Sequence, residues 1–330
     1  MNDIEVSVIV VVRNEEKYII DCIKSIESQF NNYDKWELII VDGMSEDNTK
    51  HVVKEYLKDK KYAWKLLDNP KKILASGWNL GIKNSRGKYV IRPDAHGTLH
   101  ENYIKYGLEN LEEKQDVIAV GGVLETKSKG FLGNIIKEAL SSKVGVGNSS
   151  FRTAKKSGYY DTAVYAVYRK EIFDKVGYFD ENLIRHQDND MHKRIKDIGG
   201  KFYLDTRMKA DYYCRDTVPK LLKQMFNIGL HLPKVFKIGG VSIRHLAPFS
   251  FYLTLFFLLI FGFYNNLFLK IAEVILSIYL LIIFIDSLIR SIKKKNVFIL
   301  LNTIIIPLMH FSYALGTFYG LINFINKGRE

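Results

Sequence analysis

The stretch Val6-Ser-Val-Ile-Val-Val-Val12 is a run of mostly β-branched apolar residues close to the start of the chain. A strand with one face in water alternates apolar and polar residues, whereas a strand that is buried on both faces carries an almost continuous apolar run. Residues 37–41 form a second run of this kind. The sequence therefore predicts a sheet whose two faces are both covered.

Strand and helix patterns alternate along residues 1–215. The predicted helices cover residues 15–30, 47–57, 74–84 and 101–113, and the predicted strands cover residues 6–12, 37–41, 64–67, 88–92 and 117–123. Repeated strand–helix–strand spacing predicts an α/β fold in which helices cover a mostly parallel sheet. Ligands of such sheets bind beyond the carboxyl ends of the strands, so the residues that follow each strand are the candidates for chemistry.

Polar residues directly follow three of these strands. They are Arg13, Asn14 and Glu15 after the first strand, Asp42 and Asp47 after the second, and Asp94 and His96 after the fourth. No Gly-x-Gly-x-x-Gly or phosphate-loop lysine motif follows a strand, which argues against dinucleotide oxidoreductases and P-loop NTPases. A different chemistry on nucleotides is therefore expected.

Asp94 and His96 flank one small residue at the end of a strand. Side chains at positions i and i+2 leave an extended segment on the same side, and a carboxylate with an imidazole can bind a divalent cation. Such a cation can neutralise a departing diphosphate. An isolated Asp-x-His is more often a surface pair. Asp42 and Asp47 alone would be turn and helix-cap residues, and because Asp47 opens a helix, Asp42 is the better ligand contact.

Four sequence blocks together resemble the family 2 glycosyltransferases of the GT-A fold. The blocks are Ser7-Val-Ile-Val-Val-Val-Arg-Asn-Glu-Glu16, Ile40-Val-Asp-Gly-Met-Ser-Glu-Asp-Asn-Thr49, Arg86-Gly-Lys-Tyr-Val-Ile-Arg-Pro-Asp-Ala-His96, and Gly177-Tyr-Phe-Asp-Glu181 followed by His186-Gln-Asp-Asn-Asp190, Arg194 and Gly199-Gly200. The resemblance covers about residues 4–215. It implies a Rossmann-like, mostly parallel sheet with helices on both faces, followed here by a C-terminal α-helical transmembrane region.

A closer likeness to the succinoglycan-type exopolysaccharide glucosyltransferases rests on further features. They are Asp94-Ala-His96, Tyr159-Tyr-Asp-Thr-Ala163, Gln187-Asp188 and a multi-span tail. The likeness implies transfer of a sugar from a nucleoside-diphosphate sugar, first of all a UDP-sugar, in exopolysaccharide or cell-envelope glycan synthesis.

The resemblance also implies roles for individual residues. The implied donor-binding residues are Val12, Arg13, Asn14, Glu15, Asp42 and Asp94. Among them, Asp42 matches the acid that binds the nucleotide base or ribose. Asp94 and His96 match the metal-binding Asp-x-Asp motif, with His96 in place of the second Asp, and they imply Mg²⁺ or Mn²⁺ as the cofactor.

Asp188 matches the general base of the family, with Gln187 in place of the Glu that precedes it. Asp161, Thr162 and Gln187 fall in the region that implies acceptor binding. The implied reaction is an inverting transfer, in which Asp188 accepts the proton of the acceptor hydroxyl while its oxygen attacks the anomeric carbon. Without the resemblance, Asp188 would equally well be an acidic residue at a helix N-terminus, since residues 188–198 look helical.

Processive members of the family carry Gln-x-x-Arg-Trp near the membrane. The nearest segment in this chain is Gln224-Met-Phe-Asn-Ile228, which lacks the Arg-Trp pair. The resemblance therefore implies an enzyme that adds one sugar rather than a long polymer.

Three apolar stretches, residues 247–264, 267–289 and 297–322, predict about three transmembrane helices, because a span takes ~20 apolar residues. The basic residues 290–295 join the second stretch to the third. Positive loops stay in the cytoplasm, so the preceding domain should face the cytoplasm as well. A hydrophobic helical bundle in a soluble protein is the alternative. Asp286 and Arg290 are predicted to form an ion pair rather than an ion pathway.

The formal net charge of +12 is unevenly distributed. Residues 1–192 hold 29 basic and 29 acidic residues, residues 193–244 hold 12 and 4, and residues 245–330 hold 7 and 3. A neutral N-terminal domain argues against nucleic-acid binding. The basic excess predicts an amphipathic segment at the membrane interface, with a helix that begins at residue 218 and breaks near Pro233. Packing of this helix on the soluble domain is the alternative.

These features predict three parts: a catalytic domain of residues 1–215, an interfacial segment of residues 216–246, and a membrane region of residues 247–330. The protein should be a multi-pass protein of the cell membrane with its catalytic domain in the cytoplasm. That location makes a lipid-linked saccharide the expected acceptor and membrane lipid an expected partner. Two other functions stay open, a sugar nucleotidyltransferase and a membrane transporter with a regulatory nucleotide-binding domain.

Overall fold

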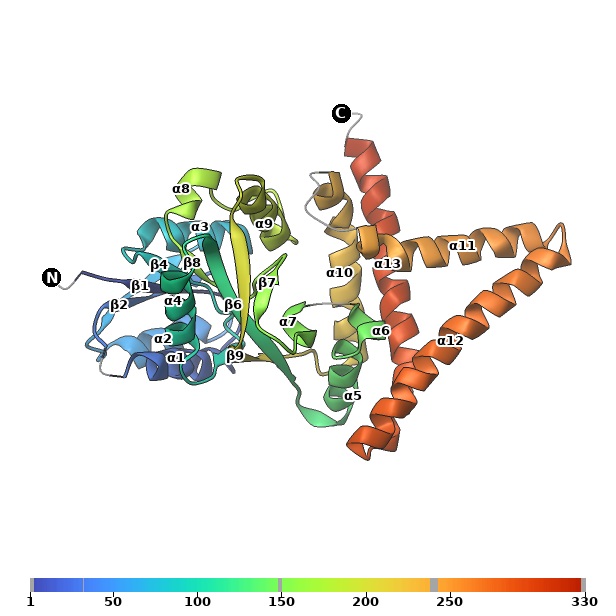
Figure 1. Cartoon of the computed structure of the whole chain (residues 1–330), viewed down its shortest axis with the longest axis horizontal. Coiled ribbons are helices and arrows are strands. Elements are labelled where there is room, and N and C mark those ends of the chain that lie inside the picture. Colours follow the sequence, from blue (N-terminus) through green and yellow to red (C-terminus); the bar gives the residue numbers. More distant parts are fainter. Residues whose placement is uncertain (1–2, 32, 148–149, 238–242, 328–330) are drawn as a thin grey trace. The chain divides into compact units, whose positions relative to one another are not determined.

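The computed structural model describes residues 3–31, 33–147, 150–237 and 243–327 (Figure 1). Its contacts divide the chain into two compact units. Unit 1 comprises residues 1–125 and 150–213, and unit 2 comprises residues 126–149 and 214–330. Residues 126–149, which the sequence placed in the catalytic domain, therefore cluster with the C-terminal helices. Residues 238–242 of the predicted interfacial segment and residues 328–330 of the predicted membrane region lie outside the described residues.

Unit 1 is built on a mixed sheet with the strand order β3-β2-β1-β4-β8-β6-β9-β5, and β7 pairs with β9. The parallel part contains β1 (Val6–Val12), β2 (Trp36–Asp42), β3 (Ala63–Asp68) and β4 (Tyr89–Ile91). Strand β1 lies between β2 and β4, and its register pairs Val12 with Asp42. The ends of β1 and β2 thus bring their polar loops to one edge of the sheet, as the sequence predicted.

The other part of the sheet is antiparallel, and only β6 of its strands was predicted. It contains β5 (Gly97–Leu99), β6 (Val117–Lys127), β7 (Gly158–Tyr160), β8 (Val167–Arg169) and β9 (Lys201–Tyr213). Strand β8 runs antiparallel to β4 and to β6, and its register places Tyr168 opposite Val90. Strands of three residues, such as β5 and β8, are too short to show a periodic sequence pattern.

Helices cover both faces of the sheet (Figure 1). One face is covered by α1 (Ile19–Glu27), η1 (Ser28–Phe30), α2 (Thr49–Leu57) and α4 (Tyr103–Glu113). The other face is covered by α3 (Leu74–Asn84), α8 (Ile172–Val176) and α9 (Gln187–Asp197). Helix α7 (Ser150–Thr153) is a single turn. The side chains of β1 alternate between the two cores, since Val8 and Val10 join the first core and Ile9 joins the second. Both faces of β1 are buried, which explains its continuous apolar sequence.

Unit 2 is helical. It contains α5 (Gly130–Leu140), α6 (Lys143–Val146), α10 (Val218–Lys237), η2 (Ile243–Leu246), α11 (Ala247–Gly262), α12 (Asn266–Lys294), η3 (Val297–Leu301) and α13 (Asn302–Lys327). Within the described residues, two stretches are long and apolar enough to cross a membrane, Asn266–Lys294 and Val297–Asn326. Helix α11 is apolar as well, but its 16 residues fall short of the ~20 that a span usually needs.

Helix α10 packs closely along α13 (Figure 1). A Cβ atom on Gly229 would lie 2.1 Å from the Tyr313 carbonyl oxygen, and one on Gly316 would lie 2.1 Å from the Phe226 carbonyl oxygen. Only glycine allows two helix backbones to approach this closely. The helix continues through Pro233, so the predicted break is wrong.

The predicted ion pair at the end of α12 is present. Arg290 Nε donates to Asp286 Oδ2 at 3.0 Å, and Ser142 Oγ donates to the same oxygen at 2.8 Å. Arg290 Nη2 also donates to the Ser141 carbonyl oxygen at 3.0 Å. Because α12 extends to Lys294, the basic residues expected to form a loop belong to its last turns and to its C-cap residue Lys295.

Candidate active site

Asp42 ends strand β2 and pairs in register with Val12 of β1. Asp42 is buried, with 1% of its surface exposed. Its Oδ2 accepts a hydrogen bond from the Ser45 N–H at 3.0 Å, whereas Oδ1 has no hydrogen-bond partner among the described residues. A buried carboxylate oxygen without a donor costs free energy. Asp42 is therefore prepared to accept a hydrogen bond from a ligand.

The loop after β1 is tied to the loop after β2. Asn14 has a left-handed backbone, with a φ of 55°. Its N–H donates to Ser45 Oγ at 3.0 Å, and its side-chain oxygen accepts the Glu46 N–H at 2.8 Å. Arg13 forms an ion pair with Glu46 at 3.5 Å on the surface. These bonds hold the predicted donor-binding loop next to Asp42.

Glu15 connects this loop to the predicted metal site. Its N–H donates to Thr49 Oγ1 at 2.8 Å, and its Oε1 lies 3.1 Å from His96 Nδ1. Asp47 Oδ1 accepts the Thr49 N–H at 3.0 Å at the start of α2. Asp47 precedes the N-cap residue Asn48 and satisfies the first N–H of α2, which leaves Asp42 as the acid that faces the candidate ligand site.

Asp94 and His96 lie in a turn between β4 and β5, where the Gly97 N–H donates to the Asp94 carbonyl oxygen at 3.0 Å. The expectation of an extended segment is therefore wrong, and alternation along a strand does not decide where these side chains point. Tyr165 OH donates to Asp94 Oδ2 at 3.2 Å, whereas His96 Nδ1 faces Glu15. Asp94 and His96 stay predicted metal ligands.

The pKa of Asp94 is raised, chiefly because burial disfavours the charged carboxylate. The positive charges of His96 and Arg92 oppose this rise, and the negative charge of Asp188 adds to it. Arg92, two residues before Asp94, donates to Asp188, so it links the predicted base to the segment that carries the predicted metal ligands. A divalent cation would relieve the burial of the Asp94 charge, and carboxylate and imidazole groups suit Mn²⁺ or Mg²⁺. The residues present fit such an ion.

Asp188 lies in the first turn of α9, and 44% of its side chain is exposed. Arg92, which directly follows β4, donates from Nη2 to Asp188 Oδ1 at 2.7 Å. The Arg92 side chain is only 5% exposed. A solvent-facing carboxylate is thus held by a buried cation through a charge-assisted hydrogen bond. Asp188 does occupy a helix N-terminus, but it also has this specific partner from the sheet.

Arg92 is held between aromatic rings. Its guanidinium carbon lies 3.9 Å from the Trp78 ring centroid and 4.4 Å from the Phe179 ring centroid, as in cation–π contacts. Its Nε and Nη1 groups have no hydrogen-bond partners in the part of the chain that the structure describes. Arg92 was not among the predicted site residues. The available signal was a charged residue directly after an apolar buried strand, since such residues are rarely buried without a partner.

The three predicted acceptor residues differ in their surroundings. Asp161 is on the surface with 90% of its side chain exposed. Thr162 is partly exposed, and its Oγ1 lies 2.9 Å from His192 Nδ1. Gln187 is buried and donates from Nε2 to the Ile184 carbonyl oxygen at 2.7 Å. Only Asp161 and Thr162 present polar groups to solvent.

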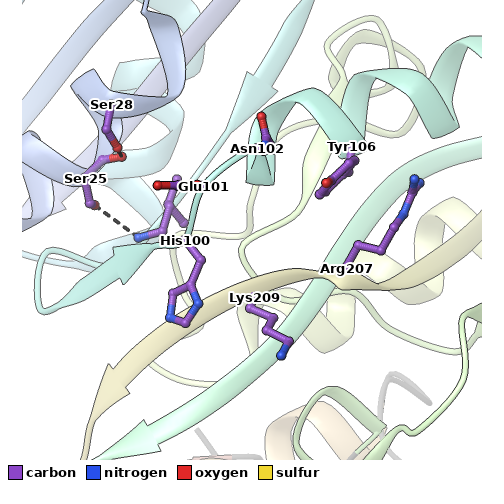
Figure 2. Close-up of a pocket in the computed structure, with 9 residues that line it drawn as sticks. Ser25, Ser28, His100, Glu101, Asn102, Tyr106, Arg207 and Lys209 are labelled. Carbon is purple, nitrogen blue, oxygen red and sulfur yellow. Dashed lines mark hydrogen bonds between the residues drawn. The ribbon is translucent and has the colours of Figure 1, made fainter.

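An open cavity of ≈ 610 Å³ lies elsewhere in unit 1, among α1, β5, α4 and β9 (Figure 2). It is lined by Ser25, Ser28, Leu99, His100, Glu101, Asn102, Tyr106, Arg207 and Lys209. His100, Glu125 and Asp211 each offer one metal-ligand atom within 4.8 Å of the others. Lys209 Nζ already lies 3.7 Å from Glu125 Oε1. None of the predicted site residues lines this cavity, so the group offers a control for experiments on the predicted metal site.

Comparisons of sequence identify the family. Residues 7–177, more than half of the chain, match Glycosyl transferase family 2. A relative from Methanococcus voltae is 29% identical over 323 residues, which are 96% of this chain and 97% of the relative. It is named "Dolichyl N-acetyl-alpha-D-glucosaminyl phosphate 3-beta-D-2,3-diacetamido-2,3-dideoxy-beta-D-glucuronosyltransferase". Succinoglycan biosynthesis protein ExoA from Rhizobium meliloti is 29% identical over 199 residues, 58% of each chain. The predicted succinoglycan likeness thus covers less of the chain.

Comparison of structures supports the fold. Mannosyltransferase PcManGT from Pyrobaculum calidifontis has a TM-score of 0.63 at 15% identity, over 97% of this chain and 87% of that chain. GalNAc-T7 has a TM-score of 0.52 at 16% identity, over 68% of this chain and 47% of that chain. These likenesses show the fold alone, and they confirm the predicted GT-A fold followed by long apolar helices. Together with the family match, they show that the chain belongs to glycosyl transferase family 2 and is a glycosyltransferase.

Proposed function

We propose that this glycosyltransferase transfers one sugar at a time, with inversion, from a nucleoside-diphosphate sugar to a lipid-linked saccharide. The arrangement around Asp188 carries the proposal. Its partly exposed carboxylate accepts a hydrogen bond from the buried Arg92 at 2.7 Å, and its charge contributes to the raised pKa of Asp94. Through Arg92, the candidate base is linked to the segment that carries the candidate donor-side carboxylate Asp94, which supports direct transfer between two bound substrates.

The donor nucleotide binds at the ends of β1 and β2 in this proposal. Asp42 Oδ1 is buried and has no partner within the described residues, so it can accept a hydrogen bond from a base N–H or a ribose hydroxyl. The GalNAc-T7 structure was solved with UDP, GalNAc and Mn²⁺, and the PcManGT structure was solved in complex with GDP-Man and Mn²⁺. We infer that a UDP-sugar is the first donor to test, with GDP-sugars as the second.

Asp94 and His96 are the residues that would hold a Mg²⁺ or Mn²⁺ ion, and Glu15 faces His96 at 3.1 Å. When bound, the ion supplies positive charge for the diphosphate leaving group. The partly buried carboxylate of Asp94 supports this assignment, because its raised pKa reflects surroundings that only partly compensate its charge.

Asp188 accepts the proton of the acceptor hydroxyl while the acceptor oxygen forms a bond to the anomeric carbon. The bond between that carbon and the diphosphate oxygen breaks on the opposite face, so the configuration at the anomeric carbon inverts. Asp188 then releases its proton to water, which its exposed side chain can reach. Arg92 keeps the carboxylate oriented throughout.

The acceptor is a lipid-linked saccharide in the cell membrane. Two supports are the long apolar stretches Asn266–Lys294 and Val297–Asn326, and the name of the M. voltae relative, which specifies a dolichyl phosphate sugar. The basic end of α12 favours a cytoplasmic position for that end. We extend this to synthesis of an exopolysaccharide or a cell-envelope glycan. No specific observation in the described residues favours a nucleotidyltransferase or a transporter.

The proposal can be tested with membranes that contain the full chain. They are incubated with Mn²⁺ and a panel of labelled UDP- and GDP-sugars, and the lipid extract is counted. Label should enter the lipid with at least one donor, and membranes that contain the Asp188→Asn variant should remain unlabelled. If no donor labels the lipid with either Mn²⁺ or Mg²⁺, the proposed lipid-linked acceptor is wrong.

A further inference from the structure

A chain of hydrogen bonds connects Thr162 to Asp188 through the interior of unit 1. Thr162 Oγ1 lies 2.9 Å from His192 Nδ1, and His192 Nε2 lies 2.8 Å from Tyr168 OH. Arg92 Nη2 donates both to Tyr168 OH at 3.3 Å and to Asp188 Oδ1 at 2.7 Å. We call these five residues the relay. Its two ends are partly exposed, whereas its three middle members are buried.

The fold brings the relay together from three segments of the chain. Val90 of β4 pairs with Tyr168 of β8, and Arg92 follows two residues later on the same face of the sheet. Asp188 and His192 are four residues apart on α9, so they share one face of that helix. This face of α9 covers Arg92 and Tyr168.

The chemistry of the members sets the direction of each hydrogen bond. An arginine can only donate, so Tyr168 OH accepts from Arg92. Tyr168 is buried, and His192 Nε2 is the one acceptor that its hydroxyl contacts among the described residues, so the hydroxyl proton is assigned to the bond with His192 Nε2. A neutral imidazole with an acceptor at Nε2 carries its proton on Nδ1, which then donates to Thr162 Oγ1. Burial keeps His192 neutral, since it lowers the pKa of this residue to about 4. The Thr162 hydroxyl proton is thus left to point away from the relay.

We propose that Thr162 donates this hydroxyl hydrogen bond to an oxygen of the acceptor saccharide, and that the relay couples acceptor binding to the orientation of Asp188. The inference rests on the proposed function, because it needs Asp188 to be the base. It assigns His192 and Tyr168 as positioning residues that touch no substrate. A saccharide hydroxyl, carbonyl or carboxylate oxygen can accept from Thr162.

Burial explains why the relay should act as a unit. Arg92, Tyr168 and His192 are polar groups inside the protein, where an unpaired donor or acceptor costs more than it does in water. If one hydrogen bond of the relay is lost, the buried side chains beside it cannot form a replacement hydrogen bond with water, so they must reorient. A change at Thr162 is therefore transmitted to Arg92, and a change at Tyr168 disturbs both ends.

A double-mutant cycle tests the proposal. Thr162→Val, Tyr168→Phe and the double variant are assayed as full chains in membranes, with the nucleotide sugar that labels lipid in the donor panel and with varied amounts of the same lipid extract as acceptor. Thr162→Ser keeps the hydroxyl and is the matched control. The readouts are the apparent KM for acceptor, kcat, the KM for donor and the rate of donor hydrolysis.

Each single variant should lower kcat and raise the acceptor KM, with a combined loss of about tenfold, because each removes one hydrogen bond of the relay. The donor KM and donor hydrolysis should stay unchanged, and Thr162→Ser, which keeps the hydroxyl, should lose less kcat and less acceptor affinity than Thr162→Val. The double variant should lose no more activity than the less active of the two single variants, because one substitution already interrupts the relay. His192→Asn, which keeps a donor towards Thr162, replaces Tyr168→Phe if the latter does not fold.

Losses that multiply in the double variant would overturn the relay, and so would a Thr162→Val variant with unchanged kcat and acceptor KM. If Asp188→Asn is inactive while the two substitutions act independently, the relay alone is wrong. If Asp188→Asn keeps its transfer activity, the assignment of the base fails, and the relay fails with it.

Discussion

Arg92 Nη2 donates to Asp188 Oδ1 across 2.7 Å, from the end of β4 to the first turn of α9. The two partners differ sharply in exposure, because Arg92 is held among the rings of Trp78 and Phe179 while Asp188 faces solvent. A rigid, buried donor thus fixes a carboxylate that substrate can still reach. This is the geometry that a general base needs, since small misplacements of a catalytic group reduce rates strongly.

Replacing Arg92 by Met should separate positioning from stability. Without the guanidinium, Asp188 loses its fixed orientation, and transfer should fall about 100-fold. The free energy of unfolding should change by less than ~1 kcal/mol, because an apolar side chain suits the aromatic surroundings and no longer buries a charge. Steady-state kinetics and thermal unfolding in detergent measure the two effects. Near-normal kcat in a folded Arg92→Met variant would mean that the ion pair has no role in the reaction.

Replacing Asp42 by Asn should weaken donor binding selectively. The amide oxygen can still accept the hydrogen bond from Ser45 N–H, but the NH₂ group replaces Oδ1, which is the acceptor proposed for the ligand. The dissociation constant for UDP or GDP, measured by calorimetry, should rise by about 10- to 100-fold, which corresponds to roughly 1–3 kcal/mol. Asp47→Asn, at the start of α2, is the control and should bind nucleotide normally. Equal losses in both variants would point to a folding defect rather than a ligand contact.

Metal dependence should map to Asp94 and not to the group formed by His100, Glu125 and Asp211. Chelation should abolish transfer and Mn²⁺ should restore it. Asp94→Asn should remain inactive at all Mn²⁺ concentrations, whereas Asp211→Asn should respond as the unsubstituted protein does. The opposite pattern, with metal rescue lost only in Asp211→Asn, would place the ion beside the cavity of Figure 2.

The charge on Asp94 should also affect stability with a definite sign. Its pKa is raised in the folded protein, so the folded state binds a proton more tightly than the unfolded state, and stability rises as pH falls through the folded pKa. At neutral pH the charged Asp94 destabilises the metal-free protein. Mn²⁺ should therefore raise the melting temperature of the unsubstituted protein and not that of Asp94→Asn. Equal shifts in both proteins would contradict this assignment.

His192 should make the protein sensitive to acid. Its pKa is about 4 in the folded protein because of burial, against ~6.5 when unfolded. The unfolded state thus binds the extra proton between pH 6.5 and 4, and stability is lost as pH falls through that window, by about 2 kcal/mol at pH 5. His192→Gln should lose less stability than the unsubstituted protein between pH 7 and pH 5. The exposed His51→Gln variant is the control, and a loss of equal size in all three proteins would show that His192 is not responsible.

The sequence predicted the parallel part of the fold well because its elements are long and periodic. The run Val6–Val12 is a strand with both faces buried, and the predicted helix at residues 74–84 matches α3 residue for residue. In the antiparallel part, β5, β7 and β8 were not predicted because each has three residues, and the longer β9 (Lys201–Tyr213) was not predicted either. The grouping of residues 126–149 with the C-terminal helices depends on tertiary contacts that no local pattern encodes.

In the candidate site too, local sequence patterns predicted some residues, whereas others depend on tertiary contacts. Asp42, Asp94 and Asp188 were predicted because each follows a strand or matches a family block, and they stay predictions. Arg92 and His192 were not predicted, because their partners lie far away in the sequence and come together only in the fold. Asp94 also lies in a turn beyond the end of β4, where strand alternation no longer decides the direction of a side chain.

The most direct test of the account is to separate donor binding from transfer in Asp188→Asn. The variant keeps its size and its place in the first turn of α9 but cannot accept a proton. Transfer of label to the lipid extract should fall by at least about 1,000-fold, while UDP or GDP binds with an unchanged dissociation constant. Asp197→Asn, at the other end of α9, should transfer normally. Transfer by Asp188→Asn at a rate close to that of Asp197→Asn would contradict the central claim that Asp188 is the base.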